Sequence, residues 1–204
     1  GDKAAYLATL EKLVMHYGKK EYWVNLLNSI ERKPDFSSRL SMDLYRLKLA
    51  VGQISKTGDF MEMSQMAIQD GNSLEALKII DQGYKSGVLG TGPEAARHGR
   101  LKDLATKRAA EAKSGLAAAE AEAQKSADGT ALVNIGFSLA TGGEYDKGIS
   151  LMEQGIKKDS LKHPDDANLH LGMAYLLAGK KSAGLKVLKT VQGKDGTGDL
   201  ARYW

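Results

Sequence analysis

Large apolar residues recur along this 204-residue chain at the spacing of one face of an α-helix. The first stripe joins Leu7, Leu10 and Val14 and continues to Tyr17, after which Gly18 interrupts it. Residues three and four positions apart share one side of a helix and so face a common core. Further helices are predicted in the same way over 23–30, 40–54, 59–70, 73–87, 130–141, 144–158, 165–178 and 181–192. No stretch has the alternation typical of a strand, so the pattern predicts an all-α protein.

Glycine, proline and small polar residues mark most of the predicted helix limits. Pro34 ends the second stripe, and Ser37 or Ser38 is expected to cap the third helix. Asp59 with Glu62 three residues later has the form of a capping box at the start of the next helix.

The clearest interruption is "VLGTGPEAARHG" at residues 88–99. Beyond it, residues 97–126 are rich in Ala, Glu, Lys and Arg and hold few large apolar side chains. This composition predicts one long, thinly packed helix, or two helices that part near Gly115. The final "DGTGDLARYW" predicts a short helix that covers the exposed end of the last helix pair.

Several glycines fall inside predicted helices, where each costs about 1 kcal/mol relative to alanine. At a constant spacing of 36 residues, Gly136 aligns with Gly172, Gly143 with Gly179, and Gly148 with Gly184. The apolar residues aligned at the same spacing are Ile149 with Leu185, Leu151 with Val187, and Met152 with Leu188. We therefore predict a repeated pair of antiparallel helices that cross closely at glycine, so that these glycines serve packing and not ligand binding.

The repeat resembles that of the tetratricopeptide repeat family. The first copy, "LVNIGFSL", gives Leu132, Gly136 and Leu139, and the second gives Gly172 followed by Tyr175. A weaker copy covers residues 57–86, while the closing proline of the family pattern is replaced by Ser160, Gly196 and Val88 in the three copies. The resemblance implies a right-handed superhelical solenoid of antiparallel helix pairs, with about 10 helices.

The chain is accordingly expected to form one tetratricopeptide-like domain over residues 1–204. Its expected parts are divergent helical repeats over 1–86, a loop with a long Ala-rich helical segment over 87–128, two clearer repeat units over 129–192, and a C-terminal capping segment over 193–204.

The resemblance also implies a concave groove, lined mainly by the first helix of each pair, that binds a peptide or a helix of a protein partner. The groove residues that it implies are Val133, Asn134, Phe137, Thr141, Leu169, His170, Met173 and Leu177, with Met61, Gln65 and Gln69 from the weaker copy. Only Asn134 matches the Lys and Asn residues that clamp a carboxylate in the chaperone-binding members of the family. The alternative is a groove filled by the protein's own helices.

The stretches "KKEYW", "VLGTGPEA" and "DLARYW" resemble a group of exported proteobacterial tetratricopeptide proteins. That resemblance implies a periplasmic location, with a secretion signal upstream of Asp2, and a cytoplasmic location is the alternative. Gly1 is read as a cloning scar, and the chain is expected to belong to a longer repeat array.

Composition and charge exclude some classes of function. The chain has no cysteine, so it has neither a disulfide framework nor a thiolate site. No apolar run is long enough to span a membrane. The net charge of +4 comes from small basic groups with acidic residues between them, which is more typical of solvated helix faces than of a nucleic-acid-binding stripe.

Three short motifs suggest chemistry, and a plainer interpretation is preferred for each. "GTGPEA" at residues 90–95 lacks the preceding strand of a dinucleotide site and reads as a loop before a helix. "AGKKS" at 178–182 lacks the first glycine of a phosphate loop. In "HPDDANLH", Asp166 and His170 could form a weak metal pair, but Asp165 or Asp166 is better explained as a helix cap after Pro164.

The sequence thus predicts a non-catalytic protein-interaction scaffold that needs no cofactor and no metal. Its partner is a protein or peptide. The alternative is a basic helical-repeat protein that binds nucleic acid, which a salt titration of oligonucleotide binding would reveal.

Overall fold

The computed structural model describes residues 2–158 and 160–204, and these residues form eleven α-helices and one short 3₁₀ helix, with no strand. The helices are α1 (Lys3–Tyr17), α2 (Lys20–Glu31), η1 (Ser38–Leu40), α3 (Ser41–Ala50), α4 (Thr57–Gln69), α5 (Ser73–Lys85), α6 (Ala95–Lys125), α7 (Thr130–Thr141), α8 (Tyr145–Ile156), α9 (Pro164–Leu177), α10 (Lys181–Leu188) and α11 (Thr197–Tyr203). The all-α prediction is confirmed. None of the described helices is both long and apolar enough to cross a membrane.

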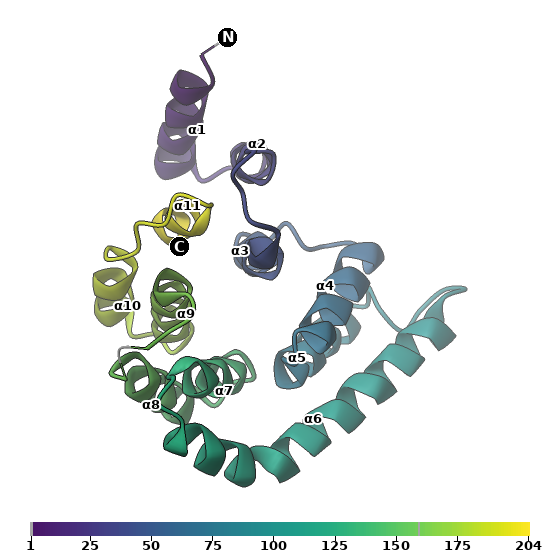
Figure 1. Ribbon diagram of the computed structural model, residues 1–204. Coiled ribbons are helices and arrows are strands. Elements are labelled where there is room, and N and C mark those ends of the chain that lie inside the picture. The colour runs from purple at the N-terminus through teal and green to yellow at the C-terminus, as the bar shows by residue number, and fades with distance from the viewer. Residues whose placement is uncertain (1, 159) are drawn as a thin grey trace.

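Three antiparallel hairpins account for most of the helices: α4 with α5, α7 with α8, and α9 with α10, whereas α1 and α2 contact each other but cross at a steep angle (Figure 1). The hairpins α7–α8 and α9–α10 also pack against each other, as successive repeats do. Helices α3, α6 and α11 have no hairpin partner. The arrangement is therefore a set of hairpins joined by single helices.

The helices follow one another around a ring that closes on itself (Figure 1). From α3 the path runs through α4 and α5, along α6, and back through α7 to α10. Helix α11 then packs against both α9 and α3. One hydrophobic core joins both ends of the chain, since Leu26 and Leu44 belong to the same cluster as Leu169 and Leu200. The ring closes by burial of apolar surface, which is the main stabilising term in folding.

The crossing of α7 and α8 is a direct backbone contact at glycine. A Cβ atom on Gly136 would lie 2.5 Å from the carbonyl oxygen of Gly148, and a Cβ atom on Gly148 would lie 2.5 Å from the carbonyl oxygen of Gly136. The crossing of α9 and α10 is also tight but less direct: a Cβ atom on Gly184 would lie 3.0 Å from the carbonyl oxygen of Gly172, and a Cβ atom on Gly172 would lie 2.5 Å from the side chain of Leu188. The prediction that these four glycines allow close helix crossing is confirmed.

A further glycine pair tightens the open end of the α7–α8 hairpin. A Cβ atom on Gly155 would lie 2.6 Å from the carbonyl oxygen of Gly129, and the backbone N–H of Gly129 donates to the carbonyl oxygen of Ser160 at 2.9 Å. Gly129 was not singled out by the sequence pattern, because it precedes the helix and has no counterpart 36 residues later.

The long Ala-rich segment is a single helix, α6, and Gly115 does not divide it. It packs on α5 and α4 through Leu101, Ala105 and Ala109, and it reaches α7 near its other end. Between residues 110 and 122, Leu116 and Glu120 are half-buried and all other residues are exposed. This middle part is held by the helix propensity of its alanines and charged residues, because tertiary contacts are few there.

Three details of helix capping differ from the predictions. Asp59 is the third residue of α4 and accepts from the backbone N–H of Lys56 at 3.1 Å, so it closes the capping box from within the helix. Ser37 precedes η1, but its side chain makes no capping hydrogen bond. Helix α9 begins at Pro164, which places Asp165 and Asp166 in its first turn and not at its cap. Both carboxylates still lie where the helix dipole favours negative charge.

Candidate functional site

The eight residues of the predicted groove lie on the facing helices α7 and α9, but most of them are covered. Five are buried, one is half-buried and two are exposed: Val133, Phe137, Thr141, Leu169 and Met173 are at most 4% exposed, His170 is intermediate, and Asn134 and Leu177 face solvent. Of the two interpretations that the sequence left open, the structure favours a groove that the protein's own helices largely fill.

Helix α3 fills the middle of the groove with the side chain of Arg46. The ring of Phe137 stacks on the imidazole of His170, with centroids 4.0 Å apart and planes 6° from parallel. The guanidinium carbon of Arg46 lies 4.7 Å from the centroid of the Phe137 ring. A cation over an aromatic face is attracted by the negative face of the ring, so Phe137 is a fixed part of the protein's own packing.

Arg46 is also the centre of a buried ionic cluster that joins α3, α5 and α9. Its guanidinium donates two hydrogen bonds of 2.8 Å to the carboxylate of Glu75 and one of 2.6 Å to Asp43. The Oδ1 atom of Asp43 lies 2.8 Å from the Nε2 atom of His170, which belongs to α9. Because Arg46, Asp43 and Glu75 are each at most 7% exposed, their charges depend on one another for solvation.

The titration of Asp43 reflects these contacts. Burial alone would raise the pKa of Asp43, but the neighbouring His170 and Arg46 outweigh it and hold the pKa at about 2. Burial likewise acts to lower the pKa of Arg46, and Glu75 with Asp43 raises it above its usual value. Asp43 and Arg46 are therefore ionised at neutral pH, and their contacts have the features of a structural link between helices more than those of a reactive centre.

On one side of the ionic cluster, part of the predicted groove stays open. We call this opening, of about 290 Å³ between α3, α4, α5, α7 and α9, the central cavity. Its apolar wall residues are Leu49, Met63, Ile79, Met173, Leu177 and Trp204. Lys78 and Gln82 from α5 and Thr141 from α7 add polar groups, so the cavity keeps three residues of the predicted groove. Figure 1 shows these helices around the centre of the ring.

A smaller hollow of about 200 Å³ lies between α7, the segment before α9 and α9 itself, and it includes Val133, Asn134 and His170. Phe137 and Leu169 are buried and line neither hollow. Pockets that bind small molecules occupy about 300–1,000 Å³, so each hollow suits a side chain or two and not a whole helix.

The structure separates the residues of the possible metal pair. The carboxylate of Asp166 accepts two hydrogen bonds from the guanidinium of Arg39, at 2.8 and 2.9 Å, whereas His170 pairs with Asp43. Asp165 accepts from the backbone N–H of Gln192 at 3.2 Å. Within the part of the chain that the structure describes, no group of three or more His, Cys, Asp or Glu side chains is placed to hold a metal ion.

The glycine motif at residues 90–95 is a loop between α5 and α6, as expected, and Gly90 and Gly92 both have positive φ. The backbone N–H of Gly90 donates to the Nδ1 atom of His98 at 3.1 Å. The sequence suggested no partner for this histidine, yet it is buried and ties the loop to the first turns of α6.

The ionic cluster was not predicted from the sequence. One signal was available, because Asp43 and Arg46 stand three residues apart beside Leu44 and Leu47 of an apolar stripe. Charged residues so close to a buried face require partners. The identity of those partners was not readable, since Glu75 lies on another helix.

Comparison of the chain with protein-family models, with curated protein sequences and with solved structures finds no match in any of the three. The resemblance to the tetratricopeptide repeat family therefore stays a prediction from the repeated residues of the sequence.

Proposed function

We propose that the chain is a non-catalytic, tetratricopeptide-like protein-interaction scaffold that binds an extended peptide of a protein partner at the central cavity. The observation that carries the proposal is the cavity itself. It is the part of the predicted concave groove that α3 leaves open, and it has apolar walls with a few polar groups. Sites of this composition bind apolar side chains and orient them by hydrogen bonds.

The size of the cavity supports an extended peptide over a docked helix. A volume of about 290 Å³ accepts one or two apolar side chains, with Leu177 at its edge and Met173 at its base. Lys78 and Gln82 are placed to bond the backbone or an acidic side chain of the peptide. The right-handed superhelical stacking expected of the family belongs to the same proposal, and the successive hairpins α7–α8 and α9–α10 support it.

A pair of matched variants tests the site. Leu177 is 41% exposed and lines the central cavity, whereas Leu104 on α6 is 42% exposed and lies outside it. Peptides selected from a displayed random library on the unmodified protein would be measured by fluorescence anisotropy. We expect Leu177→Glu to weaken their binding by about tenfold or more, as for a central contact residue, and Leu104→Glu to leave it unchanged.

Circular dichroism would confirm that both variants fold, which exposed positions should allow. Equal binding by both variants, or a library that yields no binder, would remove the central cavity as the docking site.

A periplasmic location is part of the proposal only through the resemblance to exported proteins. Cell fractionation of the natural precursor, with determination of the N-terminus of the mature protein, tests it. A precursor that stays uncleaved in the cytoplasm would contradict it.

A further inference from the structure

The surface around α10 has an uneven charge. Residues 180–194 contain five lysines and no acidic residue. Within the described residues, only Lys180 among these five forms an ion pair, with Asp146 at 2.8 Å. The other four are Lys181, Lys186, Lys189 and Lys194, and all of them are exposed. Their charges are therefore available to a partner.

Two of these lysines, Lys189 and Lys194, border a depression of about 750 Å³ between α10, α11 and the segment before η1, which we call the α10 depression. Its apolar residues are Leu185, Leu188, Val191, Ala201 and Trp204. Among these residues Leu185 is 39% exposed. The apolar surface of the depression thus remains partly open to water.

The rim of the α10 depression is basic. Lys33, Lys189, Lys194 and Arg202 line it, against two carboxylates, Asp35 and Asp199. Asp199 already forms ion pairs with Lys33 at 2.6 Å and with Arg202 at 3.1 Å. The lining therefore carries a net charge of +2, and Lys189 and Lys194 supply it without internal compensation.

We propose that the α10 depression binds an acidic amphipathic peptide of a protein partner. In this complex the apolar side chains of the peptide cover Leu185 and Trp204, and its carboxylates meet Lys189 and Lys194. Burial of the apolar surface provides affinity, and the opposite charges provide orientation and a faster encounter. The site goes beyond the central cavity, with which it shares only Trp204.

Two other anionic partners fit the geometry less well. A nucleic acid uses basic side chains for phosphates and aromatic faces for bases, whereas this depression offers aliphatic side chains and a single aromatic residue, Trp204. A flat anionic membrane would meet the lysines at the rim before it reached the buried Leu188 and Val191. Both become outcomes of the test.

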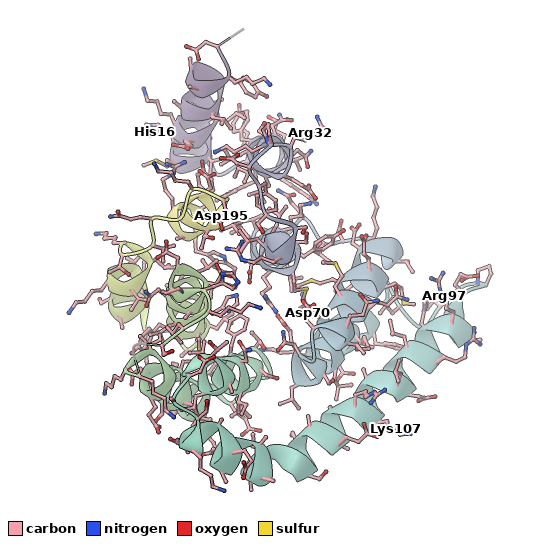
Figure 2. All side chains as sticks on the ribbon, viewed as in Figure 1. His16, Arg32, Asp70, Arg97, Lys107 and Asp195 are labelled. Atoms are coloured by element: carbon pink, nitrogen blue, oxygen red, sulfur yellow. The ribbon has the colours of Figure 1, made fainter. Side chains whose placement is uncertain are left out.

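The probe is a set of fluorescein-labelled synthetic peptides with leucines along one helical face and glutamates elsewhere, in several leucine spacings. The variants are Leu185→Glu and the double substitution Lys189→Glu with Lys194→Glu. The matched control is Lys107→Glu with Lys113→Glu on α6, since both lysines are exposed and lie outside the α10 depression. Figure 2 shows Lys107 on the far side of the ring from Asp195.

We expect at least one peptide to bind the unmodified protein, and each depression variant to weaken that binding by about tenfold. The control should bind as the unmodified protein does, and so should Leu177→Glu, which separates this site from the central cavity. Binding should weaken as salt rises, because rim charges are screened. Peptides with lysine in place of glutamate should not bind.

Trp204 gives a second measurement. The chain has two tryptophans, so a Trp23→Phe variant leaves Trp204 as the only reporter. Its emission should shift to shorter wavelength when the peptide covers it, and the shift should be absent in the Leu185→Glu variant.

Four results would overturn the proposal. They are an absence of peptide binding at low salt, equal binding by the depression variants and the control, displacement of the peptide by single-stranded or duplex oligonucleotides that bind more tightly, and tighter association with phosphatidylglycerol vesicles. The last two would assign the basic surface to nucleic acid or to lipid instead.

Discussion

The Nε2 atom of His170 and the Oδ1 atom of Asp43 lie 2.8 Å apart, although 127 residues separate them in the chain. Asp43 also accepts from Arg46, and Arg46 in turn holds Glu75. A single chain of polar contacts thus joins α9, α3 and α5 across the inside of the ring. Charges this deeply buried depend on partners that the ring alone provides.

Removal of Arg46 should destabilise the protein strongly. Arg46→Met leaves the carboxylates of Glu75 and Asp43 buried with fewer partners, and the loss of one member of a buried ion pair costs about 3–5 kcal/mol. Equilibrium unfolding in urea measures the free energy of unfolding. Arg108→Met is the matched control, because Arg108 is exposed and, among the described residues, its ion pair is with Glu111.

The double variant Arg46→Met with Glu75→Met sharpens this test. It removes the guanidinium together with the carboxylate of Glu75, which accepts two of its hydrogen bonds, so it should be less destabilising than Arg46→Met alone. If Arg46→Met cost no more than Arg108→Met, the ionic cluster would not stabilise the ring.

Acid should weaken the fold between about pH 4 and pH 2. His170 and Arg46 hold the pKa of Asp43 at about 2 against the opposing effect of burial, and Thr197 and Arg39 do the same for Asp195. A carboxyl whose pKa is lower in the folded state stabilises that state above its unfolded pKa, and this stabilisation disappears as pH falls through the folded pKa. For buried Asp43 the contribution is about 2 kcal/mol.

The measurement is the free energy of unfolding as a function of pH. Asp43→Asn should flatten its slope below pH 4. Asp70 acts in the opposite direction and at higher pH: burial raises its pKa, so its ionisation destabilises the folded state above about pH 4, outside the range in which Asp43 is tested. An unchanged slope in Asp43→Asn would show that its pKa is not lowered in the folded state.

Replacement of glycine by alanine should lower the stability of the protein where two helices cross and raise it where the glycine faces open space. Gly136→Ala would place a Cβ atom 2.5 Å from the carbonyl oxygen of Gly148 and 2.9 Å from the backbone nitrogen of Met152. Backbone cannot yield as a flexible side chain does, so we expect a loss of about 1–3 kcal/mol in the free energy of unfolding. Gly115→Ala on α6 meets nothing within 4 Å. It should gain up to about 1 kcal/mol, because alanine has the higher helix propensity.

Gly99→Ala provides a second case of the favourable kind, since Gly99 also lies inside α6 with open space around it. Thermal unfolding of the three variants is sufficient for the comparison. Similar changes at Gly136 and Gly115 would contradict the close crossing of α7 and α8.

The glycine crossings were predictable from sequence because a close backbone approach leaves a local signature. Gly136 and Gly148 interrupt good helix formers, and the interruption repeats 36 residues later. The single helix α6 was half-predictable, since its composition favours a helix and Gly115 alone left its continuity open. In both cases the deciding contacts lie within one helix or one hairpin.

The filled groove was not predictable from the same pattern. Repeat positions correctly place Phe137 and Met173 on facing helices, but they do not say where the unpaired helix α3 goes. Arg46 reaches Phe137 only because α11 and α9 bring the two ends of the chain together. Ring closure depends on apolar contacts between residues far apart in the chain, so it cannot be predicted from any local stretch of the sequence.

Arg39 should hold the C-terminal helix in place without setting the global stability. It bonds the carboxylates of Asp166 and Asp195, and Asp195 precedes α11 (Figure 2). Arg39 is about a third exposed, and partly exposed ion pairs contribute at most about 1 kcal/mol.

We therefore expect Arg39→Gln to speed amide hydrogen exchange in residues 197–203 by several-fold, with little change in the slowest amides of α7 and α9. Arg97→Gln is the control, because Arg97 lies on the far side of the ring and its ion pair in the described part of the chain is with Glu94 at 3.5 Å (Figure 2). If exchange in α11 were the same in both variants, the apolar contacts of Leu200 and Ala201 alone would hold that helix in place.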